Sequence, residues 1–267
     1  MRGTLCLCAS VCACAPRDTA QTQEEAHRDP LRRCKKGGVA AVVMLASLLG
    51  GLVGTASALA IAVPALDRPL TVSEATSFEC THDETGGKIW DSGRLLSSIL
   101  ADDYGLLDKH VVELGSGTGI GGLTAAAAGA ASVWLTDGST AVLPLLEANV
   151  KVNGLEDIAR VQRLRWGSDA DAEDDLAGLE RERPSTTPND LLIGSDLLYA
   201  PEIFPDLLET LVRLCTPEHT EVLLTFPTRF TEGIFLDMAE RDFGFECIDK
   251  EEREPALWKA SLILRES

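Results

Sequence analysis

Short apolar runs alternate with longer amphipathic segments along most of the chain after residue 90. Apolar runs of this length are typical of strands buried on both faces, and amphipathic segments are typical of the helices that cover them. The pattern therefore predicts a mainly parallel sheet with helices on both faces. We expect strands near residues 110–114, 132–136, 160–164, 190–195, 220–226, 244–249 and 257–264, and helices near residues 91–102, 119–129, 139–152, 202–214 and 231–241, with Ser139 and Thr231 at helix N-termini.

The end of the chain departs from this alternation. No long helix separates the strands expected at 244–249 and 257–264, so the simplest interpretation is a closing antiparallel hairpin. Residues 168–189 are acidic and end in prolines, which predicts a surface excursion around a short helix. Asn149 and Asn153 are interpreted as structural, because an asparagine followed by glycine is a helix termination signal.

A glycine-rich turn follows the first strand of the predicted sheet. The apolar run that ends at Leu114 leads directly into Gly115-Ser116-Gly117-Thr118-Gly119, and a second apolar run, typical of a helix, comes next. Glycine has no Cβ atom to block a ligand, and it tolerates the backbone angles of a tight turn between strand and helix. The turn therefore predicts a binding loop for a nucleotide-containing cofactor.

Two classes of cofactor fit this loop. Gly117, Gly119 and Gly122 have the spacing of a dinucleotide site, and Asp137 stands where a ribose-binding acid belongs. A dinucleotide fold, however, would need further strand-helix crossovers instead of a closing hairpin. No tyrosine-lysine pair suited to proton transfer accompanies the loop, so an oxidoreductase is the less favoured interpretation.

Three further motifs accompany the loop in a fixed order. They are Trp-Asp-Ser-Gly at 90–93, Leu-Arg-Trp-Gly at 164–167 and Asp-Leu-Leu-Tyr at 196–199. Together with Glu113 before the first glycine, this set resembles the seven-stranded (class I) methyltransferases that use S-adenosylmethionine, and among them the methyltransferase-like protein-lysine methyltransferases. The resemblance covers about residues 70 to 265 and rests on the order and strand-end positions of motifs that are weak individually. It implies an α/β, Rossmann-like sheet of seven strands with a C-terminal antiparallel hairpin.

The resemblance also implies a set of cofactor-binding residues: Trp90, Glu113, Gly115, Ser116, Gly117, Asp137, Trp166 and Ser195. We expect the Asp137 carboxylate to accept hydrogen bonds from the ribose hydroxyls and the Trp166 ring to cover the adenine. The Glu113 carboxylate would lie near the ammonium group of the cofactor, or alternatively brace the loop.

Asp196 and Tyr199 would face the methyl acceptor as the catalytic residues. A lysine acceptor must lose a proton before it attacks, because its free pKa is about 10.4. A neighbouring sulfonium cation and partial desolvation both lower the pKa of the amine, and Asp196 would orient the neutral form. Tyr199, together with Phe226, would supply aromatic walls for the lysine stem.

The front of the chain has a different composition. Residues 1–38 are basic, and their four closely spaced cysteines lack the histidines and loops of a zinc site, so no metal is predicted. Residues 39–62 carry no charge and form either a transmembrane helix, a cleaved targeting segment or a mispredicted start. We expect the methyltransferase domain to occupy residues 67–267, membrane-associated through 39–62 or organellar after processing.

The net charge limits the partners. The chain has 24 Lys and Arg against 42 Asp and Glu, a net charge of −18. This charge repels phosphate backbones and disfavours nucleic acid, whereas it suits a protein substrate with a basic segment, unless the acidity serves solubility alone. A protein lysine is therefore the expected acceptor. The alternatives are a small-molecule or other N-methyltransferase and a catalytically silent, membrane-tethered module.

Overall fold

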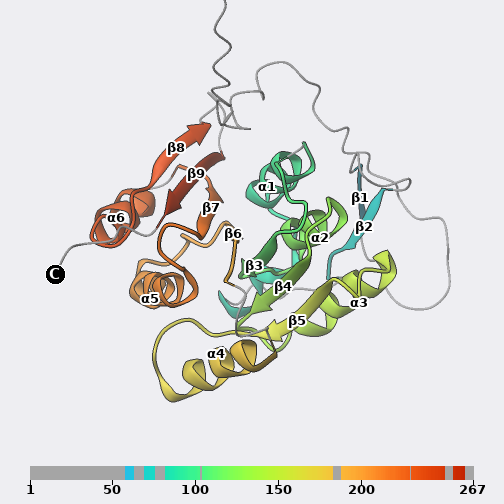
Figure 1. Cartoon of the computed structure of the whole chain (residues 1–267), viewed down its shortest axis with the longest axis horizontal. Coiled ribbons are helices and arrows are strands. Elements are labelled where there is room, and N and C mark those ends of the chain that lie inside the picture. Colours follow the sequence, from blue (N-terminus) through green and yellow to red (C-terminus); the bar gives the residue numbers. More distant parts are fainter. Residues whose placement is uncertain are drawn as a thin grey trace, which may run out of the picture.

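A single seven-stranded sheet forms the centre of the molecule (Figure 1). The computed structural model describes residues 58–62, 69–75, 82–102, 104–182, 188–228, 230–249 and 255–261. The strands are β3 (His110–Leu114), β4 (Ser132–Asp137), β5 (Ala159–Arg163), β6 (Leu191–Ser195), β7 (Glu221–Phe226), β8 (Glu246–Asp249) and β9 (Ala256–Ser261), in the spatial order β5-β4-β3-β6-β7-β9-β8. The pairs among β3 to β7 are parallel, and β9 runs antiparallel to both β7 and β8. The expected seven strands and closing hairpin are confirmed.

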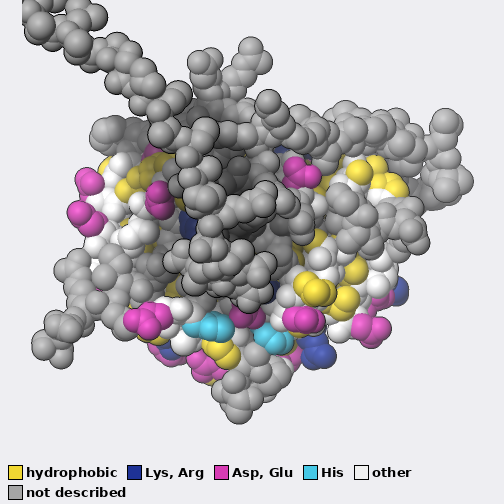
Figure 2. All heavy atoms as spheres, turned by 45° about the horizontal axis from the view of Figure 1, so that its top comes forward, with side chains coloured by type: hydrophobic (Ala, Val, Ile, Leu, Met, Phe, Trp, Pro, Cys, Tyr) yellow, Lys and Arg dark blue, Asp and Glu magenta, His cyan; other side chains and the backbone are white. Residues whose placement is uncertain are grey.

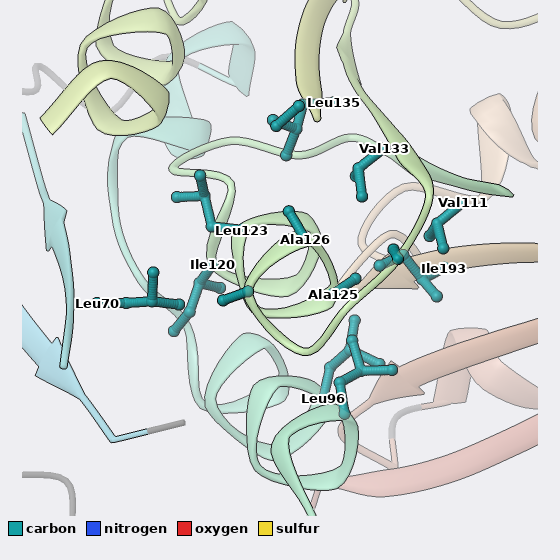
Figure 3. Packing of buried hydrophobic residues seen from close by; sticks show 14 of the residues in the cluster. Leu70, Leu96, Val111, Ile120, Leu123, Ala125, Ala126, Val133, Leu135 and Ile193 are labelled. Atoms are coloured by element: carbon teal, nitrogen blue, oxygen red, sulfur yellow. The ribbon is translucent and has the colours of Figure 1, made fainter. Parts of the chain in front are cut away.

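In the part of the chain that the structure describes, six α-helices cover the two faces of this sheet. They are α1 (Asp91–Ala101), α2 (Ile120–Ala127), α3 (Leu143–Asn153), α4 (Ala170–Glu182), α5 (Phe204–Leu214) and α6 (Phe230–Ala239). Side chains of α1, α2 and α3 pack in one apolar cluster, part of which Figure 3 shows, and side chains of α4, α5 and α6 pack in another. Val111 belongs to the first cluster and Val112 to the second, because successive side chains of a strand point to opposite faces.

One predicted helix start, near Ser139, is wrong by four residues, and the other, near Thr231, agrees within one residue. Helix α3 begins at Leu143 and not near Ser139, since the Ser139 amide is taken up by the Asp137 carboxylate in a turn that precedes the helix. Thr231 lies inside α6, and its hydroxyl donates to the Leu198 carbonyl at 2.9 Å. The helix end at Asn153 is confirmed, because Gly154 follows it with a φ of 67°.

A two-stranded antiparallel ribbon, β1 (Ala58–Ile61) and β2 (Leu70–Ser73), packs against the α1–α3 side of the core. Both strands were missed. In β1, Leu59 and Ile61 are buried, but the alanines that alternate with them, Ala58 and Ala60, are uncharged as well, so the period of two is hidden within the uncharged run.

Strand β1 bears on the expectations for the front of the chain. Residues 58–61 are a strand and not part of a helix over 39–62, and the folded part of the chain includes residues before 67. Within the parts of the chain that the structure describes, no helix has the length and apolar character needed to cross a membrane. Residues 1–57 lie outside those parts, so the basic extension and the span or targeting segment over 39–57 stay predictions.

Asn149 and Asn153 hold the ribbon in place, as the structural interpretation predicted. The Asn149 side chain accepts the Ser73 amide at 2.9 Å and donates to the Ser73 carbonyl at 3.0 Å, while Asn153 does the same for Thr71. Asn149 also donates to the Thr118 carbonyl in the glycine loop. One buried amide therefore ties the ribbon to the loop.

We expect Asn149→Ala to lower the free energy of unfolding by about 2 kcal/mol or more, because it leaves buried backbone groups of Ser73 and Thr118 without partners. Urea unfolding followed by circular dichroism measures the change. Lys151→Ala, at an exposed position of the same helix, is the matched control and should change stability by less than about 0.5 kcal/mol. Equal stability of the two variants would contradict the prediction.

Candidate functional site

The glycine loop after β3 needs glycine for two physical reasons. Gly115 and Gly117 have φ values of 56° and 54°, in the left-handed region that side chains rarely adopt. A Cβ atom on Gly117 would also lie 2.6 Å from the Gly86 carbonyl oxygen, and one on Gly115 would lie 2.7 Å from Leu197. The glycine loop therefore packs closely against the segment before α1 at Gly117 and against the loop after β6 at Gly115.

Hydrogen bonds to neighbouring elements fix the loop. The Ser116 amide donates to the Thr136 carbonyl at 2.8 Å, and the Gly117 amide donates to the Asp137 carboxylate at 3.0 Å. Within the loop, the Gly119 amide donates to the Ser116 carbonyl at 2.7 Å. These bonds join the loop to the end of β4, so the turn is rigid before any ligand arrives.

A cavity of about 780 Å³ lies at the carboxyl ends of β3, β4, β5 and β6. The order of strands reverses between β3 and β6, and in open α/β sheets ligands bind at such a switch point. Nine of the ten predicted site residues line this cavity: Trp90, Gly115, Ser116, Gly117, Asp137, Trp166, Ser195, Asp196 and Tyr199.

Asp137 ends β4 with its carboxylate at the cavity wall. One carboxylate oxygen accepts the Gly117 amide and the other accepts the Ser139 amide at 2.9 Å. Burial raises the pKa of Asp137, while these two amides act in the opposite direction. Because a carboxylate oxygen can accept more than one hydrogen bond, both oxygens can still serve a diol in the cavity.

Glu113 is the exception among the predicted residues. It lies in β3 between Val112 and Leu114, so strand alternation points its side chain to the opposite face, under α2. The carboxylate is buried against the first turn of that helix, where a Cβ atom on Gly121 would lie 2.4 Å from its oxygen. The expected position near an ammonium group in the cavity is therefore wrong, and the alternative, a brace for the loop and helix, agrees with the geometry.

The Trp-Asp-Ser-Gly motif forms the start of α1. Gly93 lets the helix approach β6, since a Cβ atom there would lie 3.4 Å from the Ser195 hydroxyl and 2.9 Å from Ile120. The Ser92 carbonyl accepts the Thr225 hydroxyl at 2.8 Å, which ties the helix to β7. Trp90 lies at the mouth of the cavity, 44% exposed, and its indole nitrogen donates to the Thr85 carbonyl at 3.2 Å.

The Asp-Leu-Leu-Tyr motif turns the chain sharply after β6. Asp196 has a φ of 56°, and its amide donates to the Thr225 carbonyl at 2.8 Å. A left-handed conformation costs a residue other than glycine about 1 to 2 kcal/mol, although aspartate tolerates it better than most. The turn buries Leu197 beside Gly115 and leaves Tyr199 46% exposed at the cavity. Asp196 and Tyr199 are thereby brought together at one end of the site.

Some residues of the site were missed and one expectation about an aromatic wall was wrong. Thr85 and Gly86, in the short 3-10 helix His82–Gly87, and Lys88 after it line the cavity. This segment has no periodicity, and only the glycine pair before the tryptophan motif could have indicated Thr85 and Gly86. Phe226, predicted as an aromatic wall, is 2% exposed and stacks on Trp258 at 5.8 Å between ring centres, away from the cavity.

The cavity fits the expected cofactor. Its floor is a loop free of side chains at Gly115 and Gly117, its wall carries a carboxylate at the end of the second parallel strand, and the Trp166 ring lies beside Gly115, 3.3 Å from where a Cβ atom there would stand. These features suit a ligand that combines an amino-acid end, a ribose diol and a flat base.

Burial raises the pKa of Glu113 from 4.5 to about 7. Since its folded pKa exceeds its unfolded pKa, the stability linked to the protonated form is present below about pH 4.5 and is lost as the pH rises past 7. Relative to Glu113→Gln, the wild-type protein should lose about 3 kcal/mol between pH 5 and pH 8, by urea unfolding. Asp137 is present in both proteins and is the smallest of the causes that shift the Glu113 pKa; parallel pH profiles would disprove the shift.

Comparison with known proteins gives the family. A family model described as "Lysine methyltransferase" matches residues 69–243. Mouse protein N-lysine methyltransferase METTL21A is 33% identical over 180 residues, 64% of this chain and 75% of that protein. Protein-lysine N-methyltransferase EFM3 of Chaetomium thermophilum is 35% identical over 155 residues, 56% of this chain and 44% of that protein, so this chain spans less than half of the fungal relative.

Solved structures agree on the fold. A protein of Streptococcus mutans assigned as a SAM-dependent methyltransferase aligns with a TM-score of 0.53 and 14% identity, over 80% of this chain and 57% of that one. The protein SMU.776, assigned as a methyltransferase and solved with S-adenosylhomocysteine, aligns with a TM-score of 0.54 and 14% identity, over 80% and 58%. With the family model matching well over half of its length, the chain belongs to the lysine methyltransferase family, and the resemblance to that family seen in the sequence is confirmed.

Proposed function

We propose that this chain methylates a lysine of a basic protein segment at the Asp196–Tyr199 end of the cavity. The observation that carries the proposal is that one cavity contains both the glycine loop with Asp137 and the turn with Asp196 and Tyr199. A cofactor seated on the loop and a side chain entering beside Tyr199 would therefore meet inside a single cavity.

The cofactor-binding residues divide according to the strands that they follow. Asp137, after β4, would accept the ribose hydroxyls, and Trp166, after β5, would cover the adenine. Gly115, Ser195 and Trp90 would enclose the amino-acid end, near β3 and β6. Bound S-adenosylmethionine supplies an electrophilic methyl group on a sulfonium sulfur.

The acceptor residues would bind, orient and desolvate the amine. The Asp196 carboxylate attracts a lysine ammonium to the cavity, and the Tyr199 ring shields its stem from water. The ammonium first releases its proton to water. The Asp196 carboxylate then holds the neutral amine by accepting a hydrogen bond from one of its N–H groups, which leaves the nitrogen lone pair free to attack the methyl group. Positioning, more than acid-base chemistry, is the task of these residues.

The charge around the cavity supports a basic substrate segment. Asp169 and Asp206 line the cavity in addition to Asp137 and Asp196, and acidic side chains are spread over the described part of the face in Figure 2. With a net charge of −18, the protein attracts cationic segments over distances of about a Debye length, roughly 8 to 10 Å. The experiment that tests the whole proposal is methyl transfer from labelled S-adenosylmethionine to purified basic proteins, with mapping of the methylated residue.

Asp137→Ala should weaken the binding of S-adenosylhomocysteine by about 30-fold or more, because two charge-assisted hydrogen bonds and the anchor of the glycine loop are lost. Isothermal titration of the full chain measures this affinity. Glu147→Ala, at an exposed position of α3, is the control and should leave the affinity within about twofold. Preserved affinity in the Asp137 variant, or equal binding of NAD by the wild type, would contradict the assignment.

Asp196→Asn should abolish most methyl transfer while leaving cofactor affinity nearly intact. Asparagine tolerates the left-handed conformation of position 196, so the turn is kept and only the charge is removed. We expect kcat for a methylated basic protein to fall about 100-fold or more, with affinity for S-adenosylhomocysteine within about threefold. Tyr199→Phe keeps the aromatic ring, and its kcat should fall far less. Parallel loss of binding and transfer in Asp196→Asn would refute this division of roles.

A further inference from the structure

Two of the described side chains that line the cavity are cationic, Lys88 and Arg165. Arg165 is already engaged: it contacts the Asp171 carboxylate at 2.5 Å and the Asp175 carboxylate at 3.0 Å. Lys88 forms no ion pair with any residue whose side chain the structure describes, and its own side chain is exposed. Lys88 is therefore the cation available to an anionic group in the cavity.

Lys88 lies over the half of the cavity that is formed by β3 and β6. The chain passes from Gly86, whose carbonyl packs on Gly117, through Lys88 to Trp90 and then to Gly93, which packs on Ser195. Arg165 follows β5 at the edge of the sheet, on the other side of β3, although the neighbouring Trp166 ring reaches back to Gly115. The position of Lys88 thus corresponds to the amino-acid end of the cofactor and not to its base.

The hydrogen-bond donors around the loop are largely used within the protein. The amides of Ser116, Gly117 and Gly119 donate to Thr136, Asp137 and Ser116, and the Ser116 hydroxyl donates to the Glu113 carbonyl at 3.3 Å. The indole nitrogen of Trp90 donates to Thr85. A carboxylate placed over the loop therefore cannot use these groups without breaking bonds that fix the site, and it needs a donor from elsewhere.

We propose that the Lys88 ammonium binds the α-carboxylate of the cofactor and makes Lys88 a specificity-determining residue for ligands with an amino-acid end. The inference rests on the proposed function and deepens it by assigning recognition of one cofactor group to one side chain. A compact ammonium on a flexible stem suits this task, because it can follow the carboxylate from the rim of the cavity.

The test compares two ligands that differ only at the amino-acid end. S-adenosylhomocysteine carries the carboxylate, whereas 5′-methylthioadenosine has the same adenosine and thioether without it. In isothermal titration of the full chain, Lys88→Met should weaken the affinity for S-adenosylhomocysteine about tenfold or more. The affinity for methylthioadenosine should stay within about twofold of the wild-type value. Lys88→Arg should retain affinity within about threefold. Lys151→Met, at an exposed position of α3, is the matched control and should leave the affinity for both ligands unchanged.

Salt gives a second readout. The loss caused by Lys88→Met should shrink as ionic strength rises, because a partly exposed ion pair is screened. If Lys88→Met weakened the affinity for both ligands equally, Lys88 would only shape the wall of the cavity. If the affinity for both ligands were unchanged, Lys88 would have no role in binding. Either result overturns the inference. In both cases wild-type binding of S-adenosylhomocysteine would stand, whereas a wild type that binds neither ligand would overturn the proposed function instead.

Discussion

The close packing of Gly117 is the constraint on which the site depends. Its amide donates to the Asp137 carboxylate, and its Cα lies against Gly86, with no space for a side chain. This one residue therefore joins the end of β3, the end of β4 and the segment before α1. Because the same contacts shape the cavity and close the fold around it, ligand binding and folding cannot be varied independently at this position.

The topology of the sheet then divides the cavity into two ends. Strands β3 and β6 are neighbours in the sheet, although 76 residues lie between the end of β3 at Leu114 and the start of β6 at Leu191. The loops that follow these two strands therefore meet at the switch point. The left-handed turn at Asp196 directs the chain after β6 across this point. On the proposed function, a methyl donor and an acceptor would thus approach from opposite ends of one cavity.

The sequence predicts well those site residues that lie at the ends of strands. It predicts poorly the orientation of residues within strands and the position of residues in irregular loops. Asp137 and Asp196 follow apolar runs, and a parallel sheet necessarily gathers such residues at one edge. Glu113 and Phe226 lie inside strands, where alternation decides between the cavity and the opposite face, and a one-residue difference reverses the outcome. Strand β1 and Lys88 had no usable signal, since one lies in an uncharged run and the other in a loop whose position depends on packing at Gly86.

Charge explains why so acidic a protein would keep a lysine at this cavity. A lysine acceptor and a sulfonium cation are both positive, and the carboxylates of Asp137, Asp169, Asp196 and Asp206 suit them. The same carboxylates repel the single anionic group of the cofactor, its α-carboxylate. Since Arg165 is neutralised by Asp171 and Asp175, a cation without a partner among the described residues is needed at the opposite end to offset that repulsion. On the proposed assignments, an acidic cavity with one local positive charge would therefore orient the cofactor and attract the acceptor at the same time.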